Sequence, residues 1–230
     1  MHTGWCGTES GHPSKDVGPA AVWSTGGGYH GDPNANSWEP KFCDPQLFQE
    51  HVWFWEPNLK VRTLEMLIPI YHDIVGRGMV MELAFSIDRD GLVQDTHAAM
   101  YKALGDWVRT CYGSPLASTS GRGAAVDGAT FDIVLGPNTT FDRFQLQEET
   151  LVGQRVRNYT VSSWNGVSKG WDTLITGDAI GTKAIHLLPQ PLTTTAEKTK
   201  LRLTVDHAIA VPVIQQFAVF APCASKSKSK

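Results

Sequence analysis

The apolar residues of this 230-residue chain follow two different periodicities, and the change falls near Ser118. Residues 52–112 alternate between short apolar runs and longer stretches with helical spacing, which is typical of the strand–helix repeat of a parallel α/β barrel. Beyond Ser118, apolar and polar residues alternate in short runs that are separated by turn residues. These runs are residues 131–136, 141–147, 155–162, 171–175, 183–188, 200–205 and 214–220. Seven short strands predict an antiparallel β-sandwich.

The clearest helical pattern runs from Leu64 to Val75, where apolar residues recur at spacings of three and four. Thr63 is a candidate N-cap, and Gly76 is expected to end the helix. Pro69 lies inside this helix and is expected to kink it, because proline cannot donate the backbone hydrogen bond of its turn.

A second helix is predicted over residues 95–112, with Asp95 as its cap and one apolar face. The aromatic segment 52–55 is expected to form a short strand closed by Pro57. Residues 79–87 are mostly apolar and are expected to form a strand of the kind that a parallel sheet buries on both faces. Residues 52–112 therefore read as strand, helix, strand, helix.

Serine, glycine and proline cluster at residues 114–122, which places the boundary between the two parts there. We predict an α/β domain over residues 1–117, a β-sandwich over residues 118–222 and a disordered basic tail over residues 223–230. Residues 1–50 are rich in breakers, and long irregular segments in a compact domain are usually functional.

The composition excludes several classes of protein. A formal net charge of −3 without a clustered basic face argues against nucleic-acid binding. No apolar run reaches the length of a membrane span. Four cysteines are too few and too scattered to predict a disulfide scaffold or a zinc site, and no metal or cofactor is expected. Cys6 and Cys43 could pair if their loops meet at the top of a barrel.

Two segments, Asn138-Thr139-Thr140 and Asn158-Tyr159-Thr160, fit the N-glycosylation sequon, which matters only in the secretory pathway. Residues 1–20 contain no apolar core of a signal peptide. Sequons without such a core lead us to expect that the natural N-terminus is missing.

One glutamate, Glu9, lies in the loop-like segment Gly-Trp-Cys-Gly-Thr-Glu-Ser-Gly at residues 4–11. Tryptophans cluster around it in the sequence, and five of the eight fall in the first quarter of the chain. These are Trp5, Trp23, Trp38, Trp53 and Trp55. Packing explains such a cluster because indole buries a large area, but stacking against the apolar face of a pyranose explains it equally well.

Residues 4–11 resemble the loop that carries the acid/base glutamate in α-L-fucosidases of glycoside hydrolase family 29, in the plant and bacterial branch. The resemblance extends from Trp5 to Phe220, through blocks whose order and spacing match. They include Gly31-Asp32-Pro33-Asn34, Trp38-Glu39-Pro40, Cys43-Asp44, Trp53-Phe54-Trp55, Val75-Gly76-Arg77, Arg89-Asp90-Gly91-Leu92, Leu104-Gly105-Asp106-Trp107, Tyr112-Gly113-Ser114-Pro115, Phe141-Asp142-Arg143 and Gly153-Gln154-Arg155-Val156.

The resemblance implies that residues 1–117 are the C-terminal part of a (β/α)8-like catalytic barrel, followed by a galactose-binding-like sandwich. It also implies retaining hydrolysis of terminal α-L-fucosyl residues, in which an aspartate attacks the sugar and a glutamic acid protonates the leaving oxygen. Glu9 would be that acid/base. Trp5 and the family positions matched by Trp38, Trp53 and Trp55 would bind the sugar at the mouth of the barrel.

The chain departs from the family at three positions that normally carry polar side chains. Gly78 replaces an asparagine, Ala84 replaces an asparagine or aspartate, and Phe42 replaces a glutamate. Glu82 matches nothing in the family, and a strand-end ion pair is the expected role. The family's nucleophile lies on a strand before the acid loop, so we expect a fragment that is inactive alone.

Two other classes of function remain open. The chain could be a non-catalytic carbohydrate-binding or interaction protein built on the sandwich, or a truncated product without a function of its own. The enzyme hypothesis predicts a fucosylated glycan or glycoside as partner, no nucleic acid or membrane, and possible self-association through an incomplete barrel edge. It places the full-length protein outside the cell or in a lysosome or vacuole.

Overall fold

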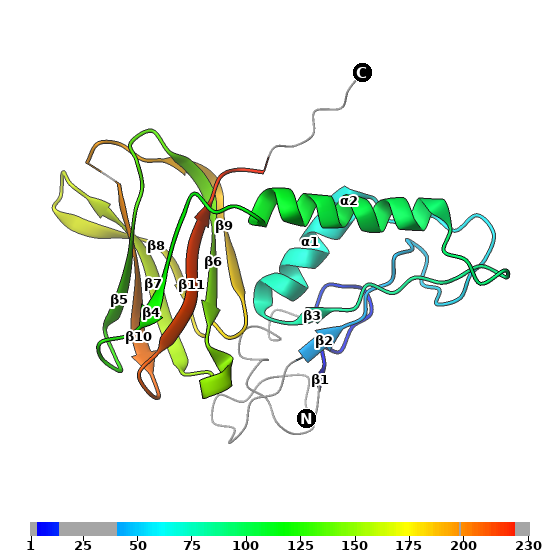
Figure 1. Cartoon of the computed structure of the whole chain (residues 1–230), viewed down its shortest axis with the longest axis horizontal. Coiled ribbons are helices and arrows are strands. Elements are labelled where there is room, and N and C mark those ends of the chain that lie inside the picture. Colours follow the sequence, from blue (N-terminus) through cyan, green and yellow to red (C-terminus); the bar gives the residue numbers. More distant parts are fainter. Residues whose placement is uncertain (1–3, 14–40, 198, 224–230) are drawn as a thin grey trace. The chain divides into compact units, whose positions relative to one another are not determined.

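The computed structural model describes residues 4–13, 41–197 and 199–223. The chain divides into two compact units, Met1–Trp107 and Val108–Lys230, which are described separately here (Figure 1). The boundaries at residues 117 and 222 stay a prediction.

The first unit contains a parallel three-stranded sheet in the order β1-β2-β3. Its strands are β1 (Gly4–Trp5), β2 (Lys41–Cys43) and β3 (Val80–Met81). Between β2 and β3 the chain forms helix α1 (Leu64–Ile74) and the 3-10 turn η2 (Val75–Arg77). A strand, a helix and a neighbouring parallel strand make up a βαβ unit, but its first strand is β2, which lies in the segment predicted to be irregular.

Helix α1 buries one face in the core of this unit. Leu67, Ile70 and Ile74 are at most 1% exposed and pack with buried residues that include Cys43 and Met79. Burying each large aliphatic side chain stabilises the fold by about 1.5–3 kcal/mol, which outweighs the missing hydrogen bond at Pro69. Thr63 is the N-cap as predicted, although its side chain makes no capping hydrogen bond.

Helix α2 (Asp95–Tyr112) has the predicted bounds. Met100, Tyr101 and Leu104 pack against the core of the first unit, and the Tyr101 hydroxyl donates a hydrogen bond to the Leu83 carbonyl oxygen. These residues recur at the helical spacing seen in the sequence, so the apolar face of α2 is the one that contacts the core.

Two predicted strands of the first unit differ from the structure. Residues 52–55 form no strand; Phe54 is 84% exposed, and the segment belongs to an excursion between Phe48 and Val61, which form an isolated antiparallel bridge. The predicted strand 79–87 shortens to β3, followed by an isolated bridge at Ala84. Its partner β2 has only three residues, so there is little backbone for it to pair with.

The second unit is the predicted antiparallel β-sandwich (Figure 1). One sheet has the order β5-β10-β7-β8, and the other has the order β4-β11-β6-β9. The strands are β4 (Ala117–Arg122), β5 (Ala129–Val134), β6 (Thr140–Glu148), β7 (Val156–Asn165), β8 (Gly170–Gly177), β9 (Ala184–Thr193), β10 (Lys200–Ala208) and β11 (Val213–Phe220), and a 3-10 turn, η3 (Thr150–Val152), follows β6. Alternate residues of both sheets, among them Phe144, Leu203 and Phe217, form one buried core.

Strand β4 was not predicted, because its sequence Ala-Ser-Thr-Ser-Gly-Arg carries no alternating apolar signal. It pairs only with β11, and an edge strand can be polar because few of its side chains enter the core. The segment that was expected to separate the domains is therefore part of the sandwich sheet.

All four cysteines form disulfides, Cys6–Cys43 and Cys111–Cys223; the sequence left the first pairing open, and the second was not predicted. The second bridge joins the end of α2 to the segment after β11, 112 residues later. The buried Arg143 guanidinium donates to the Ala221 carbonyl at 2.6 Å and lies over the Tyr112 ring. The Cys111–Cys223 pair could not be predicted from the sequence, because its two residues are far apart in the chain and share no pattern.

A hydrogen bond between the two sheets places a histidine in the sandwich interior. The Tyr159 hydroxyl on β7 lies 2.5 Å from Nε2 of His186 on β9. Burial raises the pKa of Tyr159 and lowers the pKa of His186 to about 4. His186 is therefore neutral at pH 7, and its Nε2 can accept a hydrogen bond from the Tyr159 hydroxyl.

We predict that the sandwich loses stability as the pH falls from about 6.5 to about 4. The folded-state pKa of His186 lies below its ordinary value of 6.5, so protons bind preferentially to the unfolded chain in this window. The loss should be on the order of 3 kcal/mol, since each unit of pKa shift corresponds to about 1.4 kcal/mol. Urea unfolding at several pH values measures it.

His186→Gln, which keeps an acceptor but does not titrate, should flatten this dependence even if it lowers stability at pH 7. His207→Gln serves as the matched control, because His207 is exposed and paired with Asp127 on the surface. Burial raises the pKa of Glu148, which acts in the opposite direction, so the difference between the two variants is decisive. Equal curves for both would contradict the assignment to His186.

Candidate active site

The carboxyl ends of the three parallel strands each lead to an acidic residue. Glu9 lies in the loop after β1, Asp44 directly follows β2, and Glu82 directly follows β3. Parallel strands end at the same edge of a sheet, and in α/β folds this edge is where active sites form. Asp44 was expected on an irregular loop, but its position at the end of β2 places it at this edge.

A disulfide fixes the start of the Glu9 loop. Cys6 follows β1 and is bonded to Cys43, the last residue of β2, with the two Cα atoms 5.2 Å apart. The Cys6 N–H also donates to the Phe42 carbonyl at 2.8 Å. The pairing that the sequence left open therefore joins the two strand ends beneath the glutamate.

Hydrogen bonds then hold the loop on both sides of Glu9. The hydroxyl oxygens of Thr8 and Ser10 lie 2.8 Å apart, and the Arg62 guanidinium donates to the Ser10 carbonyl at 2.9 Å. Further along, His12 Nδ1 lies 2.7 Å from an Asp73 carboxylate oxygen on α1. Burial lowers the pKa of Arg62 from its usual value.

The Glu9 side chain itself is about one-third exposed, and one of its oxygens has a partner. Oε2 lies 2.7 Å from Nε2 of His51, whose side chain is 73% exposed. Among the described residues, Oε1 of Glu9 has no hydrogen bond. His51 was missed by sequence reasoning, since nothing in the pattern links two residues 42 positions apart in irregular segments.

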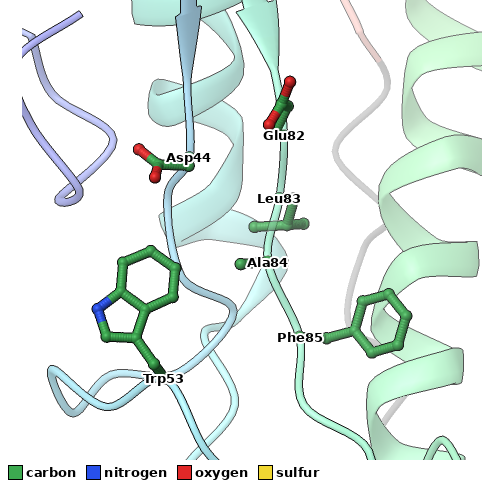
Figure 2. A pocket seen from close by; sticks show the side chains of 6 residues that line it. All are labelled: Asp44, Trp53, Glu82, Leu83, Ala84 and Phe85. Atoms are coloured by element: carbon green, nitrogen blue, oxygen red, sulfur yellow. The ribbon is translucent and has the colours of Figure 1, made fainter. Parts of the chain in front are cut away.

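A pocket of about 430 Å³ lies beside the segments that follow β2 and β3 and is lined by Asp44, Trp53, Glu82, Leu83, Ala84 and Phe85. Figure 2 shows the Trp53 indole beside Asp44 and Ala84, while Phe85 points to the other side of its strand. Within the described part of the chain Glu82 makes no ion pair, so the expected strand-end pair is not found. Ala84, at a position predicted to have lost a polar group, leaves this wall apolar.

The predicted sugar-binding tryptophans occupy different places. The Trp5 indole N–H donates to the Asp44 carboxylate at 2.6 Å, which joins the last residue of β1 to the residue after β2. Trp53 is 38% exposed at the cavity. Trp55 does not line the cavity; its ring faces the Arg89 guanidinium at 5.8 Å, and its indole N–H has no hydrogen bond among the described residues. Trp38 lies outside the described residues.

Among the described residues, no group of three or more histidine, cysteine, aspartate or glutamate side chains could hold a metal ion. No helix in the described ranges is long and apolar enough to span a membrane.

We predict that the turn after Glu9 tolerates no side chain at Gly11. Its φ of +86° is strained for other residues, and an added Cβ would meet Ile70 at 2.7 Å and Pro45 at 3.0 Å. Gly11→Ala should lower the free energy of unfolding by about 2–4 kcal/mol, from backbone strain and overpacking together. Chemical denaturation with both disulfides intact measures this.

Gly91→Ala is the matched control. Gly91 has a similar φ of +76°, but an added Cβ would meet nothing within 4 Å. The control should lose only about 1 kcal/mol from the backbone conformation. If the two variants were equally destabilised, the close packing of the loop on α1 would be refuted.

Comparisons with known proteins found several that are similar to this chain. No protein-family model matches the chain. The rice protein named "Putative alpha-L-fucosidase 1" (Oryza sativa subsp. japonica) is 27% identical over 83% of this chain and 41% of its own length. The crystal structure of a protein from Bacteroides thetaiotaomicron named "putative alpha-L-fucosidase" superposes with a TM-score of 0.82 and 28% identity, over 96% of this chain and 51% of that one.

A family 29 fucosidase of Ruminococcus gnavus, solved in complex with fucose, superposes with a TM-score of 0.75 at 21% identity, over 94% of this chain and 50% of that one. The chain thus spans about half the length of the proteins it matches. Sequence and structure together relate this chain to the α-L-fucosidases of glycoside hydrolase family 29.

Proposed function

We propose that this chain supplies the acid/base carboxylate of a retaining α-L-fucosidase-type glycoside hydrolase, with Glu9 in that role. One observation carries the proposal: Glu9 stands on a loop that is fixed by a disulfide and hydrogen bonds at the carboxyl edge of a parallel sheet. The relationship to fucosidases supplies the reaction class. In this proposal β1, β2 and β3 are strands of a (β/α)8-like barrel.

In a retaining mechanism one carboxyl group attacks the anomeric carbon while the other protonates the departing oxygen and later activates water. Glu9 suits the second task because His51 bonds only Oε2. Oε1 remains available to reach a glycosidic oxygen. The fixed loop would hold that oxygen in place, and positioning of this kind supplies much of the rate of such enzymes.

The proposed substrate is a fucosylated glycan or glycoside. The apolar face of the sugar would stack on the indole of Trp53, which is exposed at the cavity. Trp5 would act with its partner Asp44 in the floor of the same site. Roles for Trp38 and Trp55 rest on the resemblance alone.

We also propose that the nucleophile is not among the described residues. Asp44 already accepts the Trp5 indole N–H, and Glu82 stands on a later strand than Glu9, whereas the family's nucleophile stands on an earlier one. The matched relatives are about twice as long as the part they share with this chain, which leaves room for that strand.

The parallel sheet gives a second proposal about partners. Within the described residues β1 and β3 each pair on one side only, and Val80 on β3 is 52% exposed. An open parallel edge can pair with another chain, so we propose self-association of the isolated chain.

Two disulfides favour an oxidising compartment, and we propose a secreted, extracellular, lysosomal or vacuolar location for the full-length protein.

A non-catalytic carbohydrate-binding role is the second candidate, and one observation favours it. On the second unit Trp164 and Trp171 form a cross-strand pair, and the Arg202 guanidinium lies 4.3 Å from the Trp171 ring while it bonds Asp132. Aromatic rings beside polar groups suit sugar recognition. Binding of fucosylated glycans that Trp171→Ala abolishes and Glu9→Gln leaves intact would favour this function over the first.

We predict that the 230-residue chain alone does not hydrolyse an aryl α-L-fucoside above background. Retention requires a second carboxyl group about 5–5.5 Å from the first, and the proposed nucleophile is not part of the described residues. Product release from the purified chain measures this. Turnover that Glu9→Ala abolishes would show that the chain, or an oligomer of it, completes the site, and would refute the prediction.

In an intact enzyme that carries these residues, we predict that Glu9→Gln slows hydrolysis of natural fucosides by about 10²–10⁴-fold. Activated aryl fucosides should be affected less, because a good leaving group needs little protonation. The two substrates are compared by kcat/KM. Glu82→Gln is the control, since Glu82 lines the neighbouring cavity but has no proposed proton-transfer role. Equal losses on both substrates would remove Glu9 from the acid/base role.

A further inference from the structure

The two sequons occupy different environments in the second unit. Asn138 lies in the turn between β5 and β6, whereas Asn158 lies within β7. Both asparagines are exposed. Exposure alone does not separate them, so their surroundings must be compared.

The backbone of the Asn138 turn is fixed while its side chain is left for other partners. Asn138 has a φ of +59°, and its N–H donates to the Thr194 carbonyl at 2.9 Å. The Thr194 hydroxyl accepts from the Thr139 N–H at 2.8 Å and donates to the Gly136 carbonyl at 2.7 Å. Among the described residues, the Asn138 carboxamide makes no hydrogen bond. The turn thus presents this carboxamide to solvent without using it.

The remaining residue of the first sequon is also at the surface. Thr140 is exposed, and its hydroxyl oxygen lies 2.8 Å from the hydroxyl oxygen of Thr193. Neither Asn138 nor Thr140 enters the sandwich core. A large substituent on Asn138 would therefore displace no packed side chain.

The second sequon is built into the sheet. Tyr159 is 1% exposed and bonded to His186, and the Thr160 hydroxyl donates to an Asp206 carboxylate oxygen at 2.7 Å. Asn158 is paired with His207 at a register shift between β7 and β10. This asparagine belongs to a segment whose neighbours take part in the sheet and the core.

We propose that Asn138 is an N-glycosylation site. In that modification the Asn138 carboxamide nitrogen forms a bond to the anomeric carbon of an oligosaccharide carried on a lipid diphosphate. The bond from that carbon to the diphosphate oxygen breaks, the lipid diphosphate leaves, and the nitrogen loses one proton. The two disulfides agree with passage through the oxidising compartment in which this reaction takes place. The proposal does not depend on the function of Glu9.

A glycan at this position has a physical use. Edge strands expose unpaired backbone groups, and two such strands end near the turn, β5 and β9. Val134 at the end of β5 is 64% exposed, and Leu192 near the end of β9 is 37% exposed. A bulky hydrophilic substituent on the turn would hinder edge-to-edge association there.

The test is expression of the full chain through the secretory pathway of a eukaryotic host. Intact mass is measured before and after peptide N-glycosidase, which converts a glycosylated asparagine to aspartate, and peptide mapping locates the change. We expect a glycan at Asn138 in the wild type, its loss in Asn138→Gln and its retention in the matched variant Asn158→Gln. An unmodified Asn138 in the secreted wild type would overturn the proposal.

A second pair of variants leaves the asparagine in place. Thr140→Ser keeps the sequon and should keep the glycan at Asn138, whereas Thr140→Ala destroys the sequon and should lose it. This pair decides the question if Asn138→Gln is not secreted. A glycan that persists at Asn138 in Thr140→Ala, or is lost from it in Thr140→Ser, would also contradict the proposal.

Discussion

The Cys6–Cys43 disulfide is the constraint on which the candidate site depends. Strands β1 and β2 have two and three residues, and so few backbone hydrogen bonds hold a parallel register weakly. The covalent bond joins the two strands where both end, and it is at most 2% exposed in the core beneath α1. Glu9 lies three residues after Cys6, so the disulfide fixes its position more firmly than the hydrogen bonds between the two strands do.

Backbone carbonyl groups, hydroxyl groups and a histidine on either side of Glu9 make the hydrogen bonds that hold its loop in place. Arg62 bonds carbonyl oxygens on both Phe48 and Ser10, and His12 bonds Asp73. The carboxylate that could do chemistry is left with one partner, His51. The groups that hold this short loop in place are thus different from the carboxylate that could react.

In the sandwich, by contrast, some buried polar side chains have a specific partner. One oxygen of the buried Glu148 accepts the N–H groups of Arg155 and Val156, and burial still raises its pKa. Tyr159 and His186 satisfy one another across the two sheets. Such pairs specify one arrangement of the strands, because any other would leave a polar atom unpaired in the core.

The sequence by itself determined the elements whose side chains repeat with a regular period. The bounds of α2, the core face of α1 and seven of the eight sandwich strands follow from apolar spacing, because burial of one face requires that spacing. Apolar spacing failed to predict two segments, residues 52–55 and β4. The first is aromatic but exposed, and the second is polar but paired at an edge.

The resemblance of residues 4–11 to a loop of known fucosidases singled out Glu9, and family positions together with clustering in the sequence singled out the tryptophans. Only the tertiary structure decided that Cys111 meets Cys223, that Asp44 holds Trp5 and that His51 reaches Glu9. Each of these contacts joins residues that are 39 or more positions apart in the chain and carry no shared pattern. A periodic face is a local property of the chain, whereas a contact between two irregular segments exists only once the strands between them have been placed.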